Sequence, residues 1–235
     1  MTGAAHRIGA AIVRHLHQQQ YNVLVHYRHS EAAANAVIDE LNRLRVNSAV
    51  GVQSELTAGN SAKLITDTCI EHWGRLDLLV NNASEFFPTP IGSIIGSDFQ
   101  KLFSSNVEAP LMLSQAAFTH LQKTEGSVVN IIDIYAGIVH KEHSVYSSSK
   151  AALAMLTKSL AVELAPLVRV NGISPGAILW PEGDEKTPAE KEQMVARIPL
   201  KKTGSARQIA EAVVYFANAG FTTGQILSID GGRTL

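Results

Sequence analysis

The chain has 235 residues, of which 46% are hydrophobic and 17% are charged, and its formal net charge is −1. This length and balance fit one globular α/β domain and exclude a disordered or coiled-coil protein. Because the sequence holds no run of basic residues, we expect neither nucleic acid nor a membrane surface as a partner.

The sequence gives few signals of compartment or metal binding. Cys69 is the only cysteine, which excludes an intramolecular disulfide and a thiolate metal cage, and it is interpreted as a small buried side chain on a helix. No apolar run reaches the ~18 residues of a membrane span, and no signal peptide is recognisable, so we expect a cytoplasmic protein. The spacing of His6, His140 and His143 fits no compact ligand set, so these side chains are predicted to be exposed on loops and no metal is expected.

Short β-type runs alternate with longer helical runs along the chain. In chain order, the pattern predicts a strand at 22–27, a helix at 31–44, a strand at 48–53, a helix at 59–73, a strand at 76–80, a mostly helical stretch at 97–121, a strand at 126–132, a helix at 145–164, a strand at 168–173, a helix at 206–218 and a strand at 225–229. This alternation predicts a single doubly wound Rossmann-type α/β domain over residues 1–235, with a parallel sheet and helices on both faces. The polar stretch at 180–191 is interpreted as an excursion over one edge of the sheet and as a candidate lid.

The chain opens on a strand-to-helix turn, Thr-Gly-Ala-Ala-His-Arg-Ile-Gly at residues 2–9. Glycines such as Gly3 let the backbone approach a phosphate, and the helix N-terminus that follows suits a pyrophosphate. An ordinary turn that opens a helix is the alternative. No strand precedes this turn, although that strand would be the central one of the sheet. We therefore expect roughly 5–10 further residues upstream, with Met1 at the end of the strand.

The strand at 22–27 is followed by Arg28, His29 and Ser30. An acidic residue in this loop would hold the ribose hydroxyls of NAD, and the loop has none. The three side chains instead offer hydrogen-bond donors that suit a 2′-phosphate, which predicts NADPH as the cofactor. The alternative is a solvated basic loop.

Tyr146 and Lys150 form a Tyr-x-x-x-Lys pair on the predicted helix at 145–164. The i, i+4 spacing places both side chains on one face of that helix. Because a nearby ammonium stabilises a phenolate, we expect Lys150 to lower the pKa of Tyr146 toward the working pH, where the hydroxyl can give or take a proton. A chance pairing on a helix is the alternative.

Three further motifs belong with those above, namely Asn-Asn-Ala-Ser at 81–84, Asn106 and Pro175-Gly176. In their order along the chain, these motifs resemble the short-chain dehydrogenase/reductase family, and the resemblance covers essentially the whole chain. The resemblance implies an NADPH-dependent enzyme, usually a homotetramer formed through two long helices, with no metal. It implies catalytic roles for Tyr146 and Lys150, and a role for Asn106 in holding a proton-relay water near that lysine. The cofactor-binding positions that it implies are Gly3, Arg7, Ile8, Arg28, His29, Ser30, Glu55, Leu56, Asn82, Ala83, Ser84, Tyr146, Lys150, Pro175, Gly176 and Ile178.

The chain departs from the usual pattern of this family at two positions. Arg7 replaces the middle glycine of the turn, and Asp133 stands 13 residues before Tyr146, where the family usually has serine. With Phe86 after the Asn-Ala-Ser segment, both departures resemble the pteridine reductases of the family. That resemblance implies that Arg7 faces pyrophosphate and substrate, that Phe86 stacks a pterin against the nicotinamide, and that Ser84 lies near both ligands.

An Asp133–Tyr146 pair suits proton delivery to a ring nitrogen, as reduction of a C=N bond requires. We therefore expect NADPH-dependent reduction of a dihydropterin or dihydrofolate to the tetrahydro form, with Arg7, Ser84, Phe86, Asp133 and Tyr146 at the substrate. An N-terminal helix cap or a surface carboxylate is the alternative for Asp133, and core packing is the alternative for Phe86. The competing functions are reduction of a carbonyl such as a 3-oxoacyl thioester, and a catalytically silent binding protein of the same fold.

Overall fold

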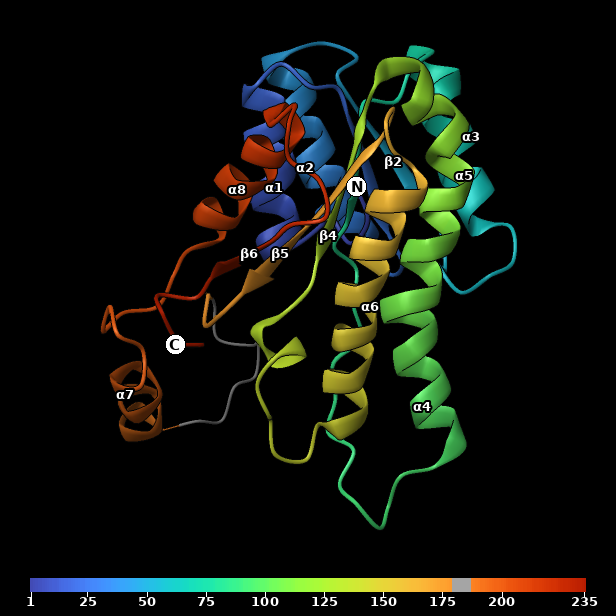
Figure 1. Ribbon diagram of the computed structural model, residues 1–235. Helices are drawn as coiled ribbons and strands as arrows, with labels where there is room; N and C mark the ends of the chain where they lie inside the picture. The colour runs from blue at the N-terminus through green and yellow to red at the C-terminus, as the bar shows by residue number, and fades with distance from the viewer. Residues whose placement is uncertain (179–186) are drawn as a thin grey trace.

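The computed structural model describes residues 1–178 and 187–235, in which parallel strands are covered by helices on two sides (Figure 1). The strands are β1 (Val23–Tyr27), β2 (Ala49–Gln53), β3 (Leu78–Asn81), β4 (Ser127–Ile131), β5 (Arg169–Pro175) and β6 (Ile226–Ile229). β1 pairs with β2, and β3, β4, β5 and β6 pair in that order, every pair being parallel. The predicted α/β class is confirmed.

Residues 1–4 lie between the two groups of strands and hydrogen-bond to both. The Thr2 N–H donates to the carbonyl of Val80 in β3 at 3.0 Å, and the Ala4 N–H donates to the carbonyl of His26 in β1 at 2.9 Å. The spatial order is therefore β2-β1-(1–4)-β3-β4-β5-β6. From this central segment, the chain adds β1 and β2 on one side and β3 to β6 on the other. The carboxyl ends of β1 and β3 therefore form the topological switch point, which is where open α/β sheets bind ligands.

The helices divide between the two faces of the sheet. α1 (Arg7–Gln18), α2 (Glu31–Leu44) and α8 (Ala206–Asn218) cover one face, and α3 (Ser61–Trp73), α5 (Ala109–Thr124) and α6 (Ser144–Glu163) cover the other (Figure 1). Neighbouring residues of one strand serve opposite faces, because side chains alternate along a strand. In β4, Val129 packs in the core beneath α1 and α8, and Val128 packs in the core beneath α5 and α6.

The predicted helix at 97–121 is three consecutive helical segments. α4 (Gly96–Phe103) is followed by a π-helical turn, η1 (Ser104–Glu108), and then by α5. Pro110 has no N–H to donate to the carbonyl of Asn106 four residues earlier, and this accounts for the widened turn. The π-turn places Asn106 in the interior, where it is buried.

A further helix, α7 (Pro188–Ala196), was not predicted. It begins with a capping box in which the Thr187 hydroxyl accepts from the N–H of Glu190, and it buries no residue. The proposed lid at 180–191 lies mostly outside the described residues, and its last part forms the start of this helix. Among the described residues, no helix is long and apolar enough to cross a lipid bilayer.

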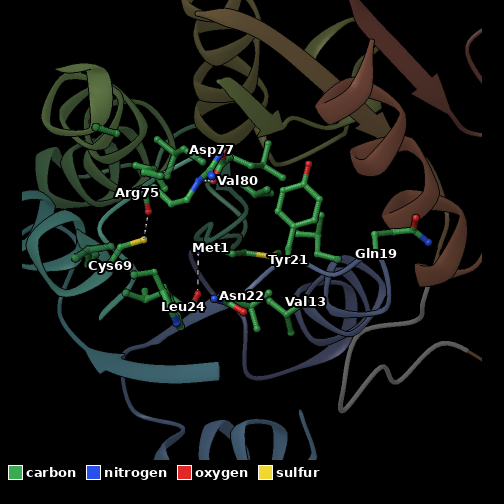
Figure 2. Close-up of a pocket in the computed structure, with 18 of the residues that line it drawn as sticks. Met1, Val13, Gln19, Tyr21, Asn22, Leu24, Cys69, Arg75, Asp77 and Val80 are labelled. Carbon is green, nitrogen blue, oxygen red and sulfur yellow. Dashed lines mark hydrogen bonds and ion pairs between the residues drawn. The ribbon is translucent and has the colours of Figure 1, made fainter. Parts of the chain in front are cut away.

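A cavity of about 620 Å³ lies beside Met1, between the first residues of β1 and β3 (Figure 2). The Met1 ammonium donates to the carbonyl of Leu24 at 3.0 Å, and the half-buried Cys69 thiol donates to the carbonyl of Arg75 at 3.7 Å. This cavity is at the amino ends of the strands. Because α/β sheets bind ligands at the carboxyl ends, the predicted chemistry belongs to the opposite edge.

Candidate active site

The turn at residues 2–9 passes very close to neighbouring backbone. A Cβ added to Gly3, whose φ is +59°, would lie 3.0 Å from the Cα of Ala83, and a Cβ added to Gly9 would lie 2.0 Å from the carbonyl oxygen of Gly3. Glycine is therefore required at both positions. The turn brings the first residues of α1 to the switch point of the sheet, where N–H groups can face an anion.

Asn82 holds this turn in place. Its side-chain amide donates to the carbonyls of Thr2 and Gly3 at 3.1 and 3.0 Å, while the Thr2 hydroxyl accepts from the N–H groups of Asn82 and Ala83 at 2.9 and 3.0 Å. These four bonds tie the end of β3 to the glycine turn. Asn82 thus shapes the predicted cofactor site through the backbone of the turn.

Arg7 begins α1 in the left-handed region, with φ at +49°. This conformation costs a side-chain-bearing residue energy that glycine would avoid, which explains why the family pattern has glycine there. The arginine is exposed and lines the cleft described below.

His26 at the end of β1 is buried and joins two loops. Its Nδ1 accepts from the N–H of Gly3 at 3.2 Å, and its Nε2 lies 3.0 Å from the carbonyl of Ser54. A carbonyl can only accept, so the proton of the neutral ring is on Nε2. Burial lowers the pKa of His26 to about 4, which keeps the ring neutral.

Arg28 already holds acidic partners. Its Nη1 lies 2.7 Å from Oε1 of Glu85, which follows β3, and 3.5 Å from Oε2 of Glu55, which follows β2. The loop of Arg28 has no acid of its own, as predicted, but two carboxylates reach the guanidinium from other strand ends. His29 and Ser30 do not line the cleft.

Asp133, Tyr146 and Lys150 meet at the carboxyl end of β4. The Tyr146 hydroxyl donates to Oδ2 of Asp133 at 2.7 Å, and the N–H of Tyr135 donates to Oδ1 at 2.9 Å. Asp133 is therefore both the N-cap of a 3₁₀ turn and the partner of the tyrosine. The Lys150 ammonium donates to the carbonyl of Ile131 at 3.2 Å and lies 5.8 Å from the Tyr146 ring centroid.

The pKa values at this centre are set mainly by burial. Burial, with the charge and hydrogen bond of Asp133, raises the pKa of Tyr146. This is the opposite of the predicted effect, because the carboxylate is in direct contact with the hydroxyl and the ammonium is not. Burial also raises the pKa of Asp133 and lowers that of Lys150 to about 8, although the charge of Asp133 raises the latter.

Asn106 is fixed entirely by protein groups. Its Oδ1 accepts from the Ser84 hydroxyl at 3.0 Å and from the N–H of Glu85 at 2.9 Å. Its Nδ2 donates to the carbonyl of Glu85 at 3.1 Å and to the Ser149 hydroxyl on α6 at 2.9 Å. Asn106 does not line the cleft. It locks the loop after β3 onto the helix that carries Tyr146.

Phe86 lies in an aromatic cluster at the mouth of the site. Its ring stacks on His143 at a centroid distance of 4.7 Å and an interplanar angle of 17°, and it meets the Tyr146 ring edge-on at 4.7 Å. Phe86 is 49% exposed, which excludes core packing. The prediction of exposed loop histidines was wrong for His140 and His143, because both are half-buried and their rings are 4.0 Å apart within this cluster.

One cleft of about 480 Å³ brings these groups together at the carboxyl ends of the strands. Of the predicted positions it collects Gly3, Arg7, Ile8, Arg28, Glu55, Leu56, Asn82, Ala83, Ser84, Phe86, Asp133, Tyr146, Lys150, Pro175, Gly176 and Ile178. It also collects residues that were not assigned to the site, namely His6, Gly9, His26, Ser54, Glu85, Ser105, Ile131 and Ile132. Glu85 could have been suspected, because it directly follows the Asn-Ala-Ser segment. No set of His, Cys, Asp and Glu side chains in the described part of the chain is arranged to hold a metal ion.

Comparison with known proteins gives the family. Residues 3–234 match a family described as Enoyl-(Acyl carrier protein) reductase. Pteridine reductase 1 of Leishmania tarentolae is 34% identical over 277 aligned residues, which cover 100% of this chain and 95% of that protein.

Two further relatives differ in what their names say they reduce. Dihydromonapterin reductase of Klebsiella pneumoniae is 29% identical, with 100% of this chain and 95% of that protein covered. A 3-oxoacyl-(acyl-carrier-protein) reductase of Staphylococcus aureus is 30% identical, with 99% and 96% covered. The similarity thus extends to relatives named for pterins and for an acyl thioester.

Proposed function

Because the chain belongs to the short-chain dehydrogenase/reductase family, we propose that this oxidoreductase is an NADPH-dependent pteridine reductase. Its substrate would be a dihydropterin or dihydrofolate, which it would reduce to the tetrahydro form. The observation that carries the proposal is the 2.7 Å hydrogen bond from the Tyr146 hydroxyl to Asp133, a carboxylate where the wider family usually has serine.

The residues of the cleft fit a nicotinamide dinucleotide. The close packing that Gly3 and Gly9 allow brings the start of α1 to the cleft, where its N–H groups suit a pyrophosphate and Arg7 lies beside them. Arg28 lies at the far end of the cleft, where a 2′-phosphate would need a cation, and Lys150 lies beside Tyr146 at the catalytic end. NADPH, when bound, supplies the hydride.

Asp133 and Tyr146 would supply the proton. In reduction of C=N, hydride bonds to carbon and the electron pair of the broken π bond takes a proton at nitrogen. Burial favours the protonated form of both groups, so a proton can be held between two oxygens 2.7 Å apart. One of them releases that proton to the ring nitrogen, and water restores it. Lys150 balances the negative charge left on the pair.

Phe86 would hold the flat ring of the substrate. Its exposed face lies at the mouth of the cleft, and its edge-on contact with Tyr146 fixes its distance from the proton donor. A stacked aromatic side chain binds a polar heterocycle while leaving its edge free for hydrogen bonds.

The second candidate is reduction of a carbonyl group, which the 30% identity to a 3-oxoacyl reductase favours. In the wider family a serine hydroxyl usually joins the tyrosine in polarising a ketone oxygen, and this chain has a carboxyl group at that position. Asp133 therefore favours the pterin.

The test is to mix the purified protein with NADPH and dihydrobiopterin and to follow the absorbance of the reduced cofactor. Acetoacetyl thioester serves as the alternative substrate, NADH as the alternative cofactor and Tyr146→Phe as the inactive control. We expect Asp133→Ser to lower pterin turnover by about 100-fold or more and to leave NADPH affinity unchanged. Turnover of the thioester without turnover of the pterin would establish the second candidate instead.

A further inference from the structure

The guanidinium of Arg28 lies between two carboxylates at the end of the cleft expected to take the 2′-phosphate. Glu85 is in hydrogen-bond contact at 2.7 Å and Glu55 is at 3.5 Å. The side chain of Arg28 is 43% exposed, that of Glu55 is 47% exposed and that of Glu85 is only 20% exposed. Glu85 is thus the closer and the more buried of the two acids.

Glu85 is held in position through its own backbone. Both its N–H and its carbonyl bond to the side chain of Asn106, at 2.9 and 3.1 Å. Asn106 is buried in the π-turn and is also bonded to Ser149 of α6. The backbone of Glu85 is therefore fixed at the cleft, and its carboxylate is less exposed than the side chain of Arg28 that it holds.

A phosphomonoester carries about −1.5 to −2 charges at neutral pH. Arg28 contributes one positive charge, and its two partners contribute two negative charges. A 2′-phosphate that binds Arg28 must therefore share the guanidinium with Glu85 and tolerate its carboxylate nearby. A cofactor with a free 2′-hydroxyl meets neither obstacle.

We propose that Glu85 is a specificity-determining residue that competes with the 2′-phosphate of the cofactor for Arg28 and so weakens the preference for NADPH over NADH. This inference rests on the proposed use of NADPH at this cleft. It assigns a part in cofactor preference to a residue after β3, outside the loop that carries Arg28.

The experiment compares binding of 2′,5′-ADP and ADP by calorimetry in the full-length wild-type protein and in Glu85→Gln. Glutamine keeps the shape of the side chain and the backbone bonds to Asn106, but removes the charge. We expect Glu85→Gln to bind 2′,5′-ADP about three- to tenfold more tightly and ADP within about twofold of wild type. Equal or weaker binding of 2′,5′-ADP by this variant would overturn the proposal, as would equal binding of both nucleotides by both proteins.

Two further variants keep the test decisive. Glu55→Gln should give a smaller gain, because Glu55 is farther from Arg28 and more exposed. Glu163→Gln, at the other end of α6 and about 25 Å along that helix from Tyr146, should change neither affinity. If Glu85→Gln does not fold, Glu85→Asp retains the charge but shortens its reach, and it should strengthen 2′,5′-ADP binding relative to wild type. Neither probe contains nicotinamide or needs a pterin, so absence of pterin turnover would refute the proposed function without affecting this result.

Discussion

Asp133 accepts a hydrogen bond from Tyr146 with one carboxylate oxygen and from the N–H of Tyr135 with the other. The cap fixes the carboxylate, and the fixed carboxylate then sets the direction of the Tyr146 hydroxyl. A residue that would serve as an ordinary helix cap is thus also the hydrogen-bond partner of Tyr146. The helix-cap alternative that the sequence left open for Asp133 is therefore found together with the contact to Tyr146.

Replacing Asp133 with asparagine should lower the pKa of Tyr146. The amide preserves an acceptor for the hydroxyl but removes the negative charge that opposes ionisation, while the burial remains. Alkaline difference spectra of wild type and Asp133→Asn measure tyrosinate formation, and the same spectra of their Tyr146→Phe forms identify the share due to Tyr146. If Tyr146 began to ionise at the same pH in both proteins, burial alone would set the pKa of its hydroxyl.

The rate of reduction should fall as the pH rises past about 8. The buried Lys150 has its pKa lowered to about 8, so it is charged below that pH and loses its charge above it. We expect log kcat at saturating NADPH to decline on the alkaline side. Lys150→Arg, whose guanidinium stays protonated, should move the decline to higher pH even if it is slower overall. A decline at the same pH in both proteins would assign it to another group.

Acid should destabilise the protein partly through His26. Burial lowers its pKa to about 4 in the folded protein, compared with 6.5 in the unfolded chain, so the unfolded state binds more protons between these values. The free energy of unfolding should therefore fall by up to about 3 kcal/mol as the pH drops through this window. Urea unfolding at several pH values measures it, and His26→Gln should show a shallower dependence on pH.

The exposed His72 provides the control for that measurement. It lies on α3, and its Nδ1–H donates to the carbonyl of Thr68 at 2.8 Å. His72→Gln removes an exposed histidine and keeps the buried His26. The free energy of unfolding of this variant should therefore depend on pH as that of wild type does. If His72→Gln flattened the curve as much as His26→Gln, burial of His26 would not be the cause.

Local patterns predicted the elements well, because apolar periodicity is a property of neighbouring residues. The strand predicted at 126–132 is β4 at Ser127–Ile131, and the helix predicted at 31–44 is α2. α7 was missed because it buries no residue and so has no apolar stripe to detect. The π-turn was missed because its signal is a single proline inside an otherwise regular helical pattern.

The site was predicted where family motifs mark it and was incomplete where partners come from distant segments. The pairing of Asp133 with Tyr146 was recognisable from a fixed spacing. The two acids at Arg28 were not, because Glu55 and Glu85 follow other strands and meet the guanidinium only when the sheet is assembled. Electrostatic conclusions drawn from one loop omit such neighbours.

His143 should affect substrate binding through Phe86. The two rings are stacked 4.7 Å apart, so the imidazole restrains the phenylalanine that is proposed to hold the pterin. We expect His143→Ala to raise the KM for dihydrobiopterin about three- to tenfold and to leave the KM for NADPH unchanged. His143→Phe, which keeps a flat ring, should restore much of the loss. A rise in the KM for NADPH instead would indicate that the whole loop has moved.

Arg7 should trade stability for cofactor binding. Its φ of +49° costs a side-chain-bearing residue about 1 kcal/mol, which glycine would recover in part. We expect Arg7→Gly to be as stable as wild type or up to about 1 kcal/mol more stable, and to bind NADPH several-fold less tightly.

Gln20 is the matched control, because it also has a left-handed backbone, with φ at +69°, but lies at the far end of α1. Gln20→Gly should reproduce the gain in stability without the loss of affinity. If Arg7→Gly bound NADPH as tightly as wild type does, the guanidinium would have no part in holding the pyrophosphate.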